Sequence, residues 1–83
     1  MDSLRAHFRE STGERLREMV ALLDSLDRDA SARERLHRHF HALSGLGATY
    51  GYPRVSELGA EGESTGDPAR WRELVDAVAR ALC

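Results

Sequence analysis

Apolar side chains recur along this chain at intervals of three and four residues, which is the spacing of one face of an α-helix. Leu4 and Phe8 predict a short helical stretch over residues 1–10. Residues 11–14 (Ser-Thr-Gly-Glu) indicate either a cap and a new start or a weak point within one long helix. A stronger amphipathic helix of about four turns follows, and its apolar face is made of Leu16, Met19, Val20, Leu23 and Leu26.

The next helix is predicted to run from Ser31 to Gly51. Ser31 is placed to cap its N-terminus, with Glu34 at the capping-box position. Gly51 suits the left-handed residue that closes many helices. The apolar stripe of this helix is regular and consists of Leu36, Phe40, Leu43, Gly47 and Tyr50.

Two further helices are predicted in the last third of the chain. Pro53 opens one that reaches about Glu61, and residues 62–66 are rich in glycine and small polar residues, which predicts a loop. Asp67 followed by Pro68 is typical of an N-cap and a first helical residue. The inward residues of the two helices are Val55 and Leu58 in the first, and Trp71, Leu74, Val75, Val78 and Leu82 in the second.

No segment alternates with the period of two that marks a strand, so the predicted fold class is all-α. Four main helices with short connections predict an antiparallel up-down four-helix bundle, with room for a short extra N-terminal helix. At 83 residues the chain is expected to form one domain, residues 1–83. A domain of this size buries only about 60–65% of its unfolded surface, which argues against a deep pocket walled by its own side chains.

Composition narrows the class of function. Twelve basic residues, all of them Arg, against 14 acidic ones give a net charge of −2, which disfavours nucleic acid as a partner. The single cysteine, Cys83, cannot form an internal disulfide, and no Cys/His spacing resembles a zinc site. No stretch predicts a membrane span or a signal peptide, so no membrane contact and a cytoplasmic location are expected.

One face of the helix around residue 41 does not belong to the predicted core. With Leu36 at zero and an advance of about 100° per residue, His41 lies at about 140° and Gly45 at about 180°. An exposed glycine within a helix costs about 0.5–1 kcal/mol relative to alanine, and such local conflicts tend to mark functional sites. Gly45 and Ala48 are expected to clear a shallow saddle beside the imidazole of His41. The alternative is that Gly45 and Gly47 are tolerated or serve close helix packing.

The charges around this histidine favour an anion. No carboxylate occurs in the sequence between Glu34 and Glu57, whereas several arginines and three histidines do. A surface without acidic groups beside a histidine would tolerate a phosphoryl group.

These residues resemble the signature helix of histidine phosphotransfer (HPt) domains. The segment from His41 to Gly51 is similar to the family pattern of His-x-Leu-Lys-Gly, small residues, an apolar residue and Gly. His41 matches the phosphorylated histidine, Leu43 the inward leucine and Gly45 the glycine one turn on. The continuation Tyr-Gly-Tyr-Pro resembles an aromatic-Gly-aromatic-Pro variant of the family.

The resemblance implies a phosphocarrier of a two-component phosphorelay rather than a catalyst with turnover of its own. His41 would accept a phosphoryl group from the aspartyl phosphate of a response-regulator receiver domain and pass it to another receiver. A histidine kinase is a further candidate partner. Mg²⁺ and the catalytic lysine are expected on the receiver, so this chain is expected to carry no cofactor and no metal, and to be a monomer.

The sequence departs from the family pattern at Ser44, where lysine is usual. Serine offers a neutral hydroxyl in place of a positive charge. Arg38 and His37 are the residues predicted to supply charge to the phosphoryl group, together with Ser44 and Gly45 in its immediate environment. Gly45 and Ala48 are the predicted docking residues.

Two alternatives stay open. Because Ser44 replaces lysine, the chain is also compatible with a degenerate HPt fold that serves protein interaction without phosphotransfer. Glu34, His37 and His41 lie at spacings of three and four on one helix face, which is compatible with a surface metal site. His39 is expected to point elsewhere, toward the edge of the core.

Overall fold

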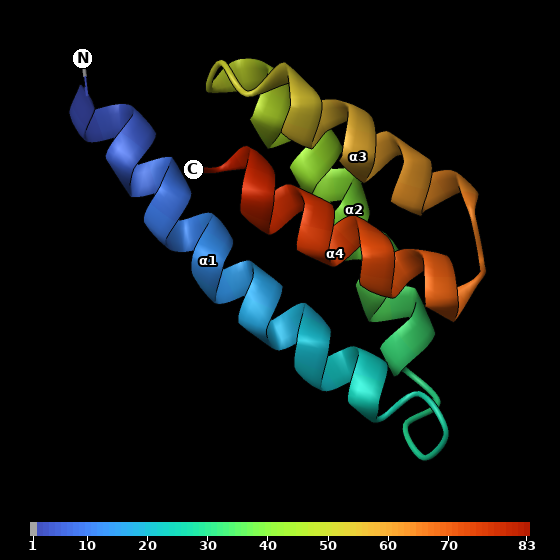
Figure 1. Ribbon diagram of the computed structural model, residues 1–83. Helices are drawn as coiled ribbons and strands as arrows, with labels where there is room; N and C mark the ends of the chain where they lie inside the picture. Colours follow the sequence, from blue (N-terminus) through green and yellow to red (C-terminus); the bar gives the residue numbers. More distant parts are fainter. Residues whose placement is uncertain (1) are drawn as a thin grey trace.

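The structure is a computed structural model that describes residues 2–83 (Figure 1). Within that range it contains four helices and no strand: α1 (Asp2–Asp24), α2 (Ala32–Thr49), α3 (Pro53–Ser64) and α4 (Pro68–Ala81). The prediction of an all-α fold with four main helices is confirmed. None of these helices combines the length and the apolar character that a membrane crossing requires.

The described N-terminal region forms one continuous helix, which agrees with the interpretation of residues 11–14 as part of one long helix and excludes a separate short helix before them. The segment predicted over residues 1–10 begins at Met1, which lies outside the described residues; the remainder of it is part of α1. Residues 11–14 do not interrupt the helix because Thr12 faces the core, 2% exposed, in line with Phe8 and Leu16. The stripe of buried residues therefore passes through the polar stretch at the spacing of a single helix.

The sequence predicts Leu4 and Val20 on the apolar faces of their helices, but the structure places both side chains outside the core. Val20 is 43% exposed and Leu4 is 62% exposed, whereas Leu22 is buried. Val20 lies on the flank of the stripe that Thr12, Leu16 and Met19 define, and its side chain faces solvent.

Successive helices run in opposite directions (Figure 1). α1 packs against α2 and α4, and α3 packs against the same two helices on the other side. The contacts between α1 and α2 agree with opposite directions. Phe8 near the start of α1 stacks on Tyr50 beyond the end of α2, and Arg15 in the middle of α1 meets His39. At the end of α1, Asp24 binds Arg72 near the start of α4.

The core of the bundle is built around two large aromatic side chains, Phe40 and Trp71, whose ring centroids lie 6.0 Å apart. Trp71 is fully buried, and its indole N–H donates to the carbonyl of Gly62 at 2.9 Å. This hydrogen bond fixes the polar edge of the buried ring and ties α4 to α3. The other side chains of the core are Phe8, Leu16, Met19, Leu22, Leu23, Ala32, Leu36, Leu43, Tyr52, Val55, Leu58, Leu74, Val75 and Val78.

The closest contact between helices joins α2 to α3 and depends on glycine. A Cβ atom at Gly47 would lie 2.6 Å from the backbone nitrogen of Ser56, and one at Gly59 would lie 2.5 Å from the backbone nitrogen of Ser44. A Cβ atom at Gly62 would overlap the ring of Phe40. Gly47 thus serves close packing, as one of the two interpretations from sequence proposed.

The predictions for the helix ends are confirmed in part. Asp67 caps α4 by accepting from the backbone N–H of Ala69 at 3.0 Å, and Gly51 has the left-handed φ of 82°. The capping box at Ser31 is wrong: its side chain donates to the carboxylate of Asp29 at 2.8 Å and caps nothing. The backbone N–H of Ser31 donates to the same carboxylate at 2.9 Å, and the hydrogen bonds from the side chain and the backbone of Ser31 lower the pKa of Asp29.

The predicted loop over residues 62–66 is also too long. α3 continues to Ser64, because Gly62 is buried against Phe40 rather than placed in a turn. The remaining connection is residues 65–67. Beside it, Arg70 of α4 binds Glu61 of α3 at 2.5 Å, and this hydrogen bond lowers the pKa of the Glu61 carboxyl group.

A matched pair of glycine variants tests the contact between α2 and α3. We expect Gly59→Ala to lower the free energy of unfolding by about 1–3 kcal/mol, because the added methyl group meets backbone atoms. We expect Gly45→Ala to raise it by about 0.5–1 kcal/mol, because nothing lies within 4 Å of a Cβ atom there. Urea unfolding followed by circular dichroism measures both, and equal effects on stability would contradict the close approach.

Candidate functional site

The imidazole of His41 stands on the exposed face of α2. Its side chain is 77% exposed, although its helix neighbour Phe40 is fully buried. The predicted outward position of His41 is therefore confirmed. The ring lies at the edge of a shallow hollow of about 370 Å³.

The residues that share this face follow the helix at intervals of four and three: Glu34, Arg38, His41, Gly45 and Ala48. All five are exposed. The N-terminal part of this exposed stripe is charged, and its C-terminal part is small. Because no atom lies within 4 Å of a Cβ built on Gly45, the surface beyond His41 is open.

The structure places an acidic side chain from a second helix, α3, beside His41. Glu63 of α3 lies with its carboxylate 2.6 Å from Nδ1 of His41. The two residues are 22 positions apart in the sequence, and sequence reasoning did not assign Glu63 to the site. The signal was present only indirectly, in Gly59 and Gly62, whose missing side chains let this part of α3 approach α2.

The contact with Glu63 assigns the two ring nitrogens of His41 different states. An ionised carboxylate can only accept a hydrogen bond, so Nδ1 of His41 carries the hydrogen. In the neutral imidazole the lone pair then belongs to Nε2. Of the two ring nitrogens, Nε2 is therefore the one whose lone pair is free to bind or to attack another group.

The predicted surroundings of His41 divide into two groups. His37 and Arg38 line the same hollow as His41, together with Glu34 and Glu63. His37 is half-buried and its ring meets Trp71 edge-on at 5.2 Å between centroids, so packing fixes it. Ser44 lies outside that set of lining residues; it is half-buried, and its backbone carbonyl accepts from the hydroxyl of Ser56 at 2.7 Å.

The expectation of a surface without acidic groups is wrong. The carboxylate-free interval of the sequence folds so that Glu63 reaches His41 from α3, while Glu34 approaches from the preceding turns of α2. Glu34 forms an ion pair with Arg38 at 2.5 Å, and both side chains are largely exposed. A run along one helix cannot show the charges that a neighbouring helix contributes.

The alternative of a metal site finds no support in the geometry. Among residues 2–83, no three His, Cys, Asp or Glu side chains lie close enough together to hold a metal ion. Glu34, His37 and His41 do not form such a group either.

His39 points to the other side of α2, as the sequence predicts. Its side chain is only 15% exposed and lies between Glu18 and Arg15 of α1. Since the guanidinium of Arg15 can only donate, Nδ1 accepts from it at 2.8 Å and Nε2 donates to Glu18. This hydrogen bond lowers the pKa of the Glu18 carboxyl group. His39 therefore joins α1 to α2.

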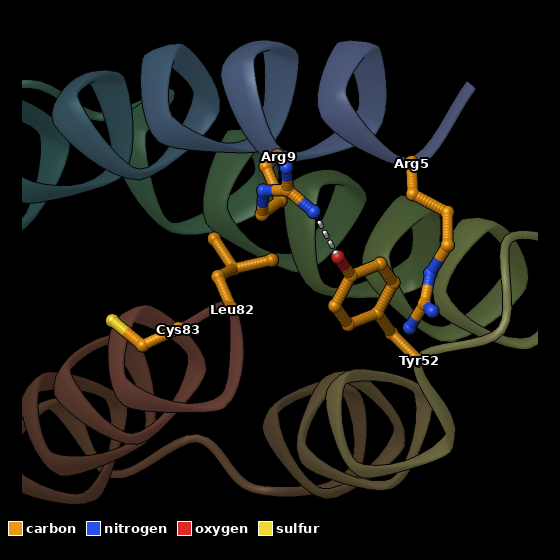
Figure 2. A pocket seen from close by; sticks show the side chains of 5 residues that line it. All are labelled: Arg5, Arg9, Tyr52, Leu82 and Cys83. Carbon is orange, nitrogen blue, oxygen red and sulfur yellow. Dashed lines mark hydrogen bonds between the residues drawn. The ribbon is translucent and has the colours of Figure 1, made fainter. Parts of the chain in front are cut away.

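A larger hollow of about 590 Å³ lies where α1, the end of α4 and the start of α3 meet (Figure 2). Arg9 donates to the hydroxyl of Tyr52 at 3.0 Å, and the guanidinium of Arg5 lies 4.7 Å from the centre of the same ring. Leu82 and the exposed Cys83 complete the lining. The contacts of both arginines hold α1 against the turn between α2 and α3, so this hollow lies at a packing interface between helices.

Comparison with known proteins agrees with this geometry. The sequence model of one family, described as the Hpt domain, matches residues 3–82. The chain therefore belongs to the Hpt domain family, whose members take part in histidine phosphotransfer in phosphorelays. Neither the curated proteins nor the solved structures contain a significant match.

Glu63→Gln tests the assignment of the ring nitrogens. An amide can donate as well as accept, so the preference for hydrogen on Nδ1 should weaken and the population with hydrogen on Nε2 should grow. NMR of the imidazole nitrogens at neutral pH reports this ratio for each histidine. His7, which is exposed and distant in sequence, serves as the internal control and should not change. An unchanged ratio at His41 would show that Glu63 does not set its tautomer.

Proposed function

We propose that this chain is a phosphocarrier that accepts a phosphoryl group on Nε2 of His41 from the aspartyl phosphate of a receiver domain and passes it to another receiver. The observation that carries the proposal is the combination at one residue: an imidazole that is 77% exposed, held through Nδ1 by Glu63, beside the open surface of Gly45. Membership of the Hpt domain family supports the same reaction.

The transfer uses the two ring nitrogens for different tasks. The lone pair of Nε2 attacks phosphorus, the new P–N bond forms, and the bond between phosphorus and the aspartyl oxygen breaks, which leaves a carboxylate on the receiver. The ring then carries a positive charge with hydrogen still on Nδ1. The carboxylate of Glu63 stabilises that charge at hydrogen-bond distance. In the onward step the P–N bond breaks and its electrons return to Nε2.

The remaining residues of the site supply clearance and charge. Gly45 and Ala48 form the docking surface on which the receiver approaches His41. His37 and Arg38, which line the hollow at His41, lie beside the phosphoryl group, with Arg38 as the permanent cation, and Ser44 and Gly45 follow on the next turn of α2. Phosphoryl transfer relies mainly on positioning and on neutralisation of charge, so a chain without a deep pocket can take part in it.

The partners that we propose follow from the reaction. Response-regulator receiver domains bind at the exposed stripe and bring Mg²⁺ with them, a histidine kinase is a further donor, and the chain acts as a cytoplasmic monomer with neither nucleic acid nor a membrane as partner. It carries the phosphoryl group without turnover of its own. A module that only binds receivers is the second candidate, favoured by the neutral Ser44 at the position where the family usually has lysine.

His41→Gln separates the two candidates. Incubation with a phosphorylated receiver should place an acid-labile label on the unaltered chain and none on the variant, while circular dichroism shows the same helix content. His7→Gln, which changes another exposed histidine, should accept label normally. Acid-labile label on the His41 variant would contradict the assignment, and the absence of label on the unaltered chain with every receiver tested would favour the binding module.

Gly45→Glu tests the docking surface. We expect no loss of stability, because the position is open, but a rate of transfer reduced by about tenfold or more through bulk and like charge against the phosphoryl group. Gly45→Ala, which adds little bulk, is the matched variant and should retain most of the rate. Stopped reactions with labelled receiver measure both rates, and a normal rate for Gly45→Glu would show that the receiver docks elsewhere.

A further inference from the structure

In the charged part of the exposed stripe, Arg38 forms an ion pair with Glu34, and this pair competes with the binding of a phosphoryl group by Arg38. Arg38 is the only permanently charged cation among the residues that line the hollow at His41. Its guanidinium donates to the carboxylate of Glu34, four residues earlier, at 2.5 Å. The side chains of the pair are 74% and 70% exposed, so solvent screens their attraction strongly.

Arg38 and His41 lie three residues apart on α2, a spacing at which side chains are neighbours with about 5–6 Å between their Cβ atoms. A phosphoryl group on His41 brings about two negative charges and three acceptor oxygens to the same hollow. A guanidinium binds such a group with two parallel hydrogen bonds, whereas Glu34 offers one negative charge. The new group is therefore the stronger partner for Arg38.

We propose that phosphorylation of His41 transfers Arg38 from Glu34 to the phosphoryl group. Glu34 is then a positioning residue that keeps the Arg38 guanidinium beside the site. Because it competes with the phosphoryl group for Arg38, Glu34 also weakens the binding of the phosphoryl group by Arg38. The proposal rests on the proposed function and assigns Arg38 the charge that Ser44 lacks. Glu34 in turn lowers the stability of the phosphorylated form, which favours onward transfer. The other groups that face the phosphoryl group are His37 and Glu63.

Chemical phosphorylation tests the exchange without a receiver. Potassium phosphoramidate transfers its phosphoryl group to histidine with loss of ammonia, and His41→Gln identifies the phosphorus NMR signal that belongs to residue 41. Titration of that signal gives the proton affinity of the bound phosphoryl group. We expect Arg38→Gln to raise this affinity about three- to tenfold, and Glu34→Gln to lower it, because the freed guanidinium favours the dianion.

The double variant distinguishes partner exchange from simple charge removal. If Glu34 acts through Arg38, its substitution has much less effect once Arg38 is glutamine, since the two residues are coupled. Equal effects of Glu34→Gln in both backgrounds, or an unchanged titration in Arg38→Gln, would overturn the proposal. The exposed pair Arg54–Glu57 on α3 provides the control, and its glutamine variants should leave the titration unchanged. Because the receiver plays no part, failure here leaves the test with His41→Gln and a phosphorylated receiver intact.

Discussion

The approach of α3 to α2 is the contact on which both the fold and the site depend. At Gly47 and Gly59 the two backbones lie so near that a Cβ atom would collide with backbone atoms, and at Gly62 a Cβ atom would overlap the ring of Phe40. The result is a pair of helices in direct backbone contact, where one carbonyl of α2 accepts from the hydroxyl of Ser56. Close packing of this kind gains dispersion energy over a wide contact although the glycines themselves bury little apolar surface.

The exposed histidine, His41, gains its partner from the same contact. Gly62 admits the Phe40 ring beneath α3, and the next residue along the chain, Glu63, then reaches Nδ1 of His41. One glycine therefore connects the packing of the core to the state of a surface imidazole. A bulkier residue at that position would have to push α3 outward, and the carboxylate would move away with it. The site is open to solvent, whereas the contact between α2 and α3 beneath it is closely packed.

The sequence predicts the parts of this molecule that depend on one helix alone. The stripe that buries Leu36, Phe40 and Leu43, the cap at Asp67, the left-handed Gly51 and the exposure of His41 all follow from local spacing. What depends on a second helix could not be read in this way. Glycine is ambiguous, because it ends helices and also permits their close approach. The glycines of residues 62–66 therefore predict a loop where α3 continues to Ser64, and the sequence alone does not bring Glu63 to the site.

The charges around His41 are a second example of a feature that depends on more than one helix. Between Glu34 and Glu57 the sequence has no carboxylate, and this interval predicts a site without acidic groups. In three dimensions two carboxylates lie near His41, and they act differently. Glu63 contacts the ring itself, where it would compensate the charge that arises in the proposed reaction, whereas Glu34 contacts Arg38, the cation that we propose for the phosphoryl group. A carboxylate that binds the ring favours the phosphorylated form, and one that binds the cation opposes it. A carrier that must both accept and release the same group requires such a balance, since a site made only of cations would hold phosphate too firmly to pass it on.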